Sequence, residues 1–293
     1  MPRASVIVPT HNRLATLKGA VESVHKQTFR DLELIIVDDG STDGTASWDA
    51  GADASLIKIP APGRGAAAAR NRALQTATGE FIAFLDDDDR WRPAYLAAQV
   101  AQLDAHPEAQ VSIAGHVEVH ASGATSQPLL KPAYAYSSEL AWMLAECPIH
   151  TLSAAVCRRT AFERVGLLDE SLRIVHDLEW YVRVIQAGGK FVSTPEVLVE
   201  HAVPGGLVTR HRDWFYEERK VRQQCTSISV RERDVIGIAR ELFFARTSLA
   251  NGDAAFAFAR AITGFAKGPR VAASMIARRL RQRRQFAKME ETQ

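Results

Sequence analysis

Residues 80–91 read EFIAFLDDDDRW, and the prediction of the fold starts from this stretch. Its apolar residues form a short run that is typical of a buried strand: Phe81, Ile82, Phe84 and Leu85. Four aspartates follow the run without a break, from Asp86 to Asp89. A strand interior cannot hold unpaired carboxylates, so these side chains are expected at the strand's end, beside solvent or a ligand.

The aspartates have two interpretations. Residues i and i+2 share a face of an extended chain, so Asp86 and Asp88 can point the same way. Two carboxylates aimed at one spot suit Mg²⁺ or Mn²⁺, ions that usually also bind phosphate oxygens. In the alternative interpretation, the aspartates form a solvated acidic turn that caps a helix after Pro93.

Composition limits the class of protein. The chain of 293 residues is long enough for one large α/β domain or a domain with an appendage, and 46% hydrophobic residues supply a core. Three widely spaced cysteines indicate neither a disulfide framework nor a zinc site and favour a reducing cytosol. The sequence shows no signal peptide and no run long enough to span a bilayer, so we expect a cytoplasmic protein, soluble or peripheral on the inner face of the membrane.

Apolar patterns alternate along the first hundred residues. Strands are predicted over 4–8, 32–37 and 56–59, and helices from residue 14 to 24 and from residue 66 to 77. Alternating strands and helices with short loops predict a mostly parallel sheet with helices on both faces. Ligands of such sheets lie at the carboxyl ends of the strands, and three of these ends carry polar motifs: Pro9–Arg13, Asp38–Asp39 and Asp86–Asp88.

Successive blocks of the chain resemble the inverting glycosyltransferases of family 2, which have the GT-A fold. The blocks are SVIVPTHNR (5–13), LELIIVDDGSTDGT (32–45), GRGAAAARNRAL (63–74) and GEFIAFLDDDDRWRP (79–93). Two later blocks, AAVCRRTAFERVGLLDESL (154–172) and HDLEWYVRVIQAGGKFV (176–192), resemble the acceptor half of that fold. The similarity covers about residues 4 to 210 and implies a GT-A domain over 1–212, with a nucleotide-sugar half to about 110 and an acceptor half after it.

The resemblance implies roles for the donor side. Asp88 would bind Mn²⁺ or Mg²⁺, Asp86 would lie near the ribose, and Asp39 would accept the imide N–H of a uracil-like base. Asp38 is more plausibly structural. The remaining residues assigned to the nucleotide sugar are Pro9, Thr10, His11, Asn12, Arg13, Arg64, Arg70 and Asp87. Arg64 and Arg70 could each be solvated instead, and Arg70 could also form an ion pair with the acidic stretch.

Asp177 is the candidate catalytic residue. Leu178, Tyr181, Val182 and Ile185 recur at helical spacing, so Asp177 lies in a first turn, where a carboxylate also complements the helix dipole. In the related enzymes the acid at this position is the general base that takes the acceptor hydroxyl's proton. An acidic residue usually precedes it, whereas this chain has His176.

His201 is the second candidate metal ligand. Glu200-His201 with Pro204-Gly205-Gly206 resembles the family's terminal loop, where a histidine can approach the metal and diphosphate. The alternative is an ordinary loop histidine. 

The region 213–293 carries long helical patterns, and the predicted last helix, after Pro269, is basic and amphipathic. Its basic residues are Arg278, Arg279, Arg281, Arg283 and Arg284. Such a helix could bind an anionic membrane surface, remain solvated or contact another subunit of a homo-oligomer. Nucleic acid fits worse, because the basic run lacks interleaved aromatics.

Together these features predict a metal-dependent inverting glycosyltransferase. It would move a sugar from a nucleotide-diphosphate donor, expected to be a UDP-sugar, to a hydroxyl of a glycan or lipid-linked acceptor in surface polysaccharide synthesis. One alternative is a sugar nucleotidyltransferase, which would be expected to open with a Gly-rich triphosphate loop and a nearby Lys. The other is a non-catalytic relative that binds a sugar nucleotide.

Overall fold

The structure is a computed structural model that describes residues 1–51, 54–59, 63–120, 122–123, 125–126, 138–146, 151–203, 211–225 and 227–276. Two segments used in the sequence analysis lie outside these residues: residues 204–206 and the arginines from Arg278 to Arg284. No helix in the described ranges has the length and the apolar character that crossing a membrane requires.

The chain forms two compact units. Met1–Ala133 and Pro148–Gly205 form the first, and Tyr134–Cys147 and Gly206–Gln293 form the second. Residues 134–147, which the sequence places in the acceptor half, therefore belong with the C-terminal helices. The first unit is built on a mixed sheet, and the second is helical.

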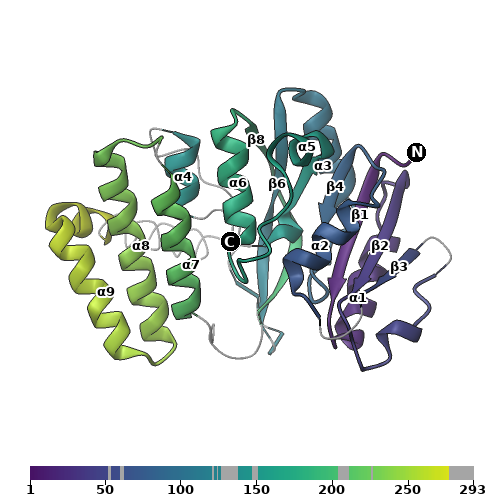
Figure 1. The fold of residues 1–293 in the computed structure, drawn as a ribbon, viewed down its shortest axis with the longest axis horizontal. Coiled ribbons are helices and arrows are strands. Elements are labelled where there is room, and N and C mark those ends of the chain that lie inside the picture. The colour runs from purple at the N-terminus through teal and green to yellow at the C-terminus, as the bar shows by residue number, and fades with distance from the viewer. Residues whose placement is uncertain are drawn as a thin grey trace, which may run out of the picture. The chain divides into compact units, whose positions relative to one another are not determined.

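The strands of the sheet are β1 (Ala4–Thr10), β2 (Leu32–Asp38), β3 (Ala54–Lys58), β4 (Phe81–Phe84), β5 (Arg90–Trp91), β6 (Ala109–His120), β7 (Ala155–Arg158) and β8 (Lys190–Val203). Their order across the sheet is β3-β2-β1-β4-β7-β6-β8-β5 (Figure 1). β7 runs antiparallel to both β4 and β6, and β5 runs antiparallel to β8. The other strands are parallel, as the sequence predicts.

The helices of the first unit are α1 (Leu14–His25), α2 (Ala66–Leu74), α3 (Tyr95–Ala105), α5 (Arg159–Val165) and α6 (His176–Gln186). All seven residues of β1 are buried, so both faces of the strand are covered. The apolar core on one face joins Val6 and Val8 of β1 to residues of α1 and α3. Since α2 also packs on β1 and β2, helices flank the sheet and leave its carboxyl edge for the polar loops.

Two elements near the acidic stretch are irregular. Residues 152–157 comprise a 3-10 helix over Leu152–Ala154 followed by β7. β8 is one long strand whose pairing with β6 shifts register. β8 continues to Val203, so His201 lies on a strand, and its predicted position in a loop is wrong.

The helices of the second unit are α4 (Glu139–Glu146), α7 (His211–Gln224), α8 (Val230–Ala250) and α9 (Ala254–Lys267). Its aromatic core contains Phe215, Phe244 and Phe256. Inside this unit, Arg240 forms two hydrogen bonds with the buried carboxylate of Glu218. A buried charge needs such a partner, because burial removes its hydration.

Candidate active site at the carboxyl edge of the sheet

The four aspartates after β4 form a turn. The N–H of Asp89 donates to the carbonyl oxygen of Asp86 at 3.0 Å, which closes the turn. The chain is therefore not extended here, and the prediction that Asp86 and Asp88 share a face of an extended chain is wrong. Each carboxylate instead has its own partners, and Asp87 and Asp89 are buried while Asp86 and Asp88 are partly exposed.

Residues from the end of β1 hold one side of the acidic turn. The hydroxyl of Thr10 donates to Oδ2 of Asp87 at 2.7 Å. The guanidinium of Arg13 donates to Oδ1 of Asp87 at 3.2 Å and to Oδ2 of Asp88 at 2.7 Å. Burial, followed by the charges of Asp86 and Asp89, raises the pKa of Asp88 to about 6, despite the opposing charge of Arg13. Asp88 is therefore subject to the charges of the neighbouring aspartates as well as to burial.

Arg70 holds the other side of the turn from α2. Its Nη2 donates to Oδ1 of Asp86, and its Nη1 lies 3.0 Å from Nε2 of His176. Its side chain is only 5% exposed, so the alternative that Arg70 is solvated is wrong and the alternative of an ion pair with the acidic stretch is realised. Arg70 thereby links the acidic turn to the start of α6.

Asp89 is fully buried and joins β8 to the turn. Its Oδ1 accepts from Nδ1 of His201 and from the backbone N–H of Ala202, both at 2.9 Å. Its Oδ2 accepts from the hydroxyl of Thr151 at 3.0 Å. Burial lowers the pKa of His201, but the hydrogen bond to Asp89 and the nearby carboxylates outweigh burial and raise it to about 9.

Asp177 lies in the first turn of α6, as predicted. Its Oδ1 accepts from the N–H of Leu178 at 2.7 Å. Burial raises its pKa to about 6, against the lowering effects of that hydrogen bond and of the Arg70 charge. The charge of Asp86 also raises this pKa, which places the candidate base in the electrostatic field of the acidic turn.

Asp39 occupies a separate part of the same edge. Its two carboxylate oxygens accept the backbone N–H groups of Arg64 and Gly65, at 2.9 and 2.7 Å. A Cβ on Gly63 would lie 2.3 Å from the carbonyl oxygen of Asp39, so this approach requires glycine. Nδ1 of His11 lies 2.8 Å from the same carbonyl oxygen. Asp39 therefore fastens the loop before α2 to the end of β2.

The loops after β1 and β2 are also joined to each other. The side-chain oxygen of Asn12, a residue in the left-handed region at φ 54°, accepts from the N–H of Thr42 at 2.7 Å. The carboxylate of Asp43 accepts from the N–H of Leu14 at 2.9 Å and so caps α1 from outside its own segment. Asp38 accepts from the N–H of Ser41 at 2.9 Å, which agrees with the structural role predicted for it.

The structure thus joins most of the predicted residues in two groups, one around the acidic turn and one around Asp39. The guanidinium of Arg64 contacts neither group: its side chain is 69% exposed and its partner is Glu170. Pro9 is a buried member of β1. Sequence reasoning missed Thr151, Ser153 and Asn71. The hydroxyl of Ser153 accepts from the N–H of Asp86, and Asn71 holds the backbone of Leu168.

The donor set at the turn fits a divalent cation in its chemistry. Asp88 supplies hard oxygen ligands in a concentration of negative charge, and the Asp89–His201 pair has the carboxylate–histidine form that commonly orients a metal-binding imidazole. Across the described parts of the chain, no group of three or more His, Cys, Asp or Glu side chains is arranged to hold a metal ion. The protein would therefore need further ligands from the donor phosphates or water.

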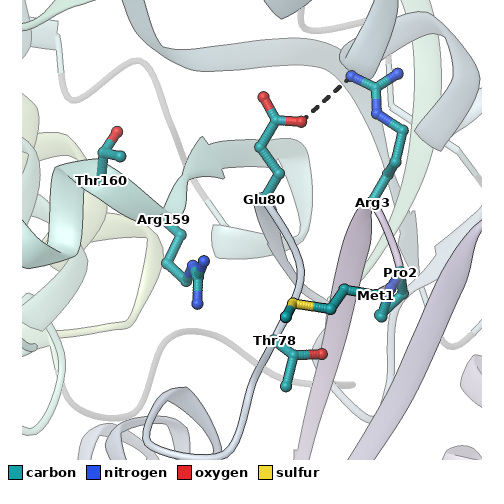
Figure 2. A pocket seen from close by; sticks show the side chains of 7 residues that line it. All are labelled: Met1, Pro2, Arg3, Thr78, Glu80, Arg159 and Thr160. Atoms are coloured by element: carbon teal, nitrogen blue, oxygen red, sulfur yellow. Dashed lines mark hydrogen bonds and ion pairs between the residues drawn. The ribbon is translucent and has the colours of Figure 1, made fainter.

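A pocket of about 280 Å³ lies at the opposite edge of the sheet (Figure 2). Its lining includes Arg3 and Glu80, which come directly before β1 and β4 and form an ion pair. None of the predicted site residues lines it. Because the acidic turn, Asp39 and the Arg13 loop all follow the carboxyl ends of strands, the site is assigned to that edge.

The chain belongs to glycosyltransferase family 2. The family described as "Glycosyl transferase family 2" matches residues 5–166, which is more than half of the chain. This match confirms the resemblance seen in the sequence and defines the protein as a member of a transferase family.

Individual relatives agree with that membership. An uncharacterized glycosyltransferase of Rickettsia typhi is 26% identical over 211 residues, which cover 71% of this chain and 66% of that protein. The UDP-Glc:alpha-D-GlcNAc-diphosphoundecaprenol beta-1,3-glucosyltransferase WfgD of Escherichia coli is 41% identical over 101 residues, or 34% of this chain and 40% of that enzyme. The chain thus spans less than two thirds of the length of either protein.

A solved structure confirms the fold. TarS 1-349 of S. aureus in complex with UDP-GlcNAc superimposes with a TM-score of 0.62 at 17% sequence identity, over 94% of this chain and 92% of that one. The GT-A fold predicted from the sequence is therefore the fold of this protein.

Proposed function

We propose that the protein is an inverting, metal-dependent glycosyltransferase. It transfers a sugar from a nucleotide-diphosphate donor to a hydroxyl of a glycan or lipid-linked acceptor. The observation that carries this proposal is the position of Asp177, whose partly buried side chain lies at the start of α6 and is subject to the charges of Arg70 and Asp86. A candidate base and a candidate donor site therefore share one edge of the sheet.

Asp177 acts as the general base. A pKa of about 6 keeps the carboxyl deprotonated at neutral pH and close enough to that pH for efficient proton transfer. The carboxylate takes the acceptor hydroxyl's proton as the hydroxyl oxygen bonds to the anomeric carbon. The bond from that carbon to the diphosphate breaks on the opposite face. This single displacement inverts the sugar's configuration and forms no covalent intermediate.

The donor occupies the edge between Asp39 and the acidic turn. Each oxygen of Asp39 accepts one backbone N–H and has a second lone pair left for the imide N–H of uracil. Asp86 lies near the ribose. The guanidinium of Arg13, half exposed at the turn, is available to the diphosphate.

Asp88 and His201 would hold a Mn²⁺ or Mg²⁺ ion, and its charge would neutralise the diphosphate leaving group. Asp89 keeps the imidazole of His201 oriented through the bond to Nδ1, so Nε2 would be the candidate ligand atom. Because the pKa of His201 is about 9, the cation would have to displace the proton on Nε2. Arg13 donates to one oxygen of Asp88 in this structure, so a bound cation and the Arg13 guanidinium would both contact this carboxylate.

The nature of the substrates is supported by the names of relatives. The E. coli relative's name gives a UDP-glucose donor and an acceptor linked to diphosphoundecaprenol. A putative biosynthetic glycosyltransferase of Bacillus subtilis, named for teichuronic acid, is 39% identical over 103 residues. The first name favours a UDP-sugar donor and a lipid-linked acceptor for this chain, and the second favours a role in the synthesis of a polysaccharide.

A panel of nucleotide sugars tests the proposal. The protein is incubated with each compound and Mn²⁺, with and without lipid-linked or glycan acceptors. Release of the nucleoside diphosphate, increased by an acceptor, is the expected result. Release of pyrophosphate from a sugar phosphate and a nucleoside triphosphate would instead identify a nucleotidyltransferase. Binding without turnover of any donor would identify a non-catalytic relative.

A further inference from the structure

An exposed apolar stripe runs along α9. Phe258, Ile262 and Phe265 are spaced four and three residues apart, so they lie on one face of the helix, and their side chains are 69%, 53% and 41% exposed. The helix has a separate buried face, with Phe256, Ala257 and Gly264. The exposed stripe is therefore additional to the face that packs inside the helical unit.

The spacing of these three residues is typical of a binding face on a helix. Single exposed apolar residues are common on soluble proteins, but a row of large ones on one helix face marks an interaction site. Smaller apolar residues beside the stripe, Ala255, Ala259 and Ala266, are also exposed. The continuous apolar surface thus follows α9 for most of its length.

Positive charge accompanies the stripe. From Ala254 to Lys288 the sequence contains nine Lys and Arg residues and no Asp or Glu. Arg260 and Lys267 both form ion pairs with Glu241 of α8. The other seven follow α9, beginning with Arg270. An apolar helix face next to an excess of basic residues is the pattern of a helix that lies in the interface of an anionic membrane.

We propose that α9 docks on a membrane surface that contains anionic lipids, with Phe258, Ile262 and Phe265 inserted at the level of the headgroups. The basic residues after the helix add attraction to the headgroups, at about fivefold in affinity for each side chain near the surface. A second copy of this chain is a poorer occupant, because the sequence after α9 has seven Lys and Arg and no Asp or Glu up to Lys288, so two copies would bring like charges together. The interaction does not depend on sugar transfer.

Vesicle flotation tests the proposal. The full-length protein is mixed with vesicles of phosphatidylcholine alone or with 30% phosphatidylglycerol, about the fraction used for an anionic surface. Binding is expected to the anionic vesicles at low salt and to fall several-fold at high salt, because salt screens the charges. The double substitution Phe258→Ser/Ile262→Ser should lower binding by about tenfold or more, since it removes two large apolar side chains.

A matched variant controls for a general loss of surface hydrophobicity. Val230 and Leu249 lie on α8 and are 77% and 64% exposed, so Val230→Ser/Leu249→Ser removes a similar amount of exposed apolar surface outside the stripe. This control should bind vesicles like the original protein. Circular dichroism and thermal unfolding establish that both variants are folded.

Two results would overturn the proposal. In the first, the original protein does not bind anionic vesicles. In the second, the stripe variant Phe258→Ser/Ile262→Ser binds them as well as the original protein does. A change from dimer to monomer in the stripe variant, measured by light scattering without vesicles, would assign the face to a second copy. Diphosphate release from a soluble donor is measured in parallel and should be unaffected by the stripe variant, so failure here leaves the proposed reaction untouched.

Discussion

Arg70 donates a hydrogen bond from Nη1 to Nε2 of His176 across 3.0 Å. A guanidinium has no acceptor, so Nε2 must be the acceptor and the imidazole carries its proton on Nδ1. Burial, and then the charge of Arg70, lowers the pKa of His176 to about 3. The residue before Asp177 is therefore neutral at physiological pH, where the resemblance leads one to expect an acid.

Replacing His176 by an acid should move the pH dependence of the reaction. In His176→Glu, the charge of the new carboxylate would raise the pKa of Asp177. The carboxylate would also pair with Arg70, whose charge lowers the pKa of Asp177 in the original protein, and so weaken that lowering effect. We expect the acidic limb of the kcat profile to shift upward by about one pH unit. The neutral control His176→Gln should keep the original profile. Identical limbs in the two variants would show that this position does not tune the base.

Removing the base should separate turnover from donor binding. Asp177→Asn is expected to lower kcat by about 10² to 10⁴, the usual loss for a positioned base, while the donor's Kd stays near normal. Isothermal titration with a UDP-sugar and single-turnover kinetics provide the two measurements. A parallel loss of donor affinity would assign Asp177 to the nucleotide site or to folding.

The original enzyme should lose activity in acid. Asp177 acts when deprotonated, so kcat should rise with pH up to about 6 and then level off. Its effect on stability has the opposite sign. Because burial raises the pKa from 3.8 to about 6, its contribution is present below 3.8 and is lost as the pH rises through about 6. A kcat profile without an acidic limb, measured together with the pH dependence of unfolding, would contradict this assignment.

Asp88→Asn should weaken metal-dependent donor binding and abolish turnover. The amide keeps the side chain's shape but removes a charge from the proposed metal site. Calorimetry in Mn²⁺ and in EDTA measures the effect. Glu80→Gln, at the opposite edge of the sheet, is the control for a lost carboxylate. Equal donor affinity in Asp88→Asn and in the original enzyme, with and without EDTA, would remove Asp88 from the metal site.

Thr151→Val should destabilise the first unit. Its hydroxyl donates to Asp89 at 3.0 Å and to Asp86 at 3.3 Å, so valine takes a partner from a buried carboxylate. We expect a loss of about 1–3 kcal/mol in the free energy of unfolding, seen as a lower melting temperature. Thr151→Ser keeps the hydroxyl and should restore most of it. Equal melting temperatures for all three proteins would exclude this role.

The core strands could be predicted because their residues carry unambiguous signals. β1, β2 and β4 are short apolar runs that end in polar motifs, and periodicity identifies such runs directly. β5 has only two residues, too few for any periodic signal. β8 contains an interruption that reads as a break between strands, and only its long pairing with β6 makes it continuous.

Part of the site could be predicted, because some of its residues are recognisable from their type and position in the sequence. These are the four consecutive aspartates after a strand and the acid at the start of a helix. Thr151 and Asn71 are ordinary residues, and their importance arises from partners 62 and 97 positions away in the sequence. The sequence also left the conformation of the acidic stretch open, because four consecutive aspartates suit either an extended strand end or a turn.

The cap that Asp43 places on α1 bears on attempts to change the donor. Because Leu14 is capped by the loop after β2, the loops at 9–13 and 39–45 form one transferable module. Grafting either loop alone from another family member would leave a helix end without its acceptor and Asn12 without Thr42. Engineers who wish to exchange donor specificity should therefore move both loops as a matched pair.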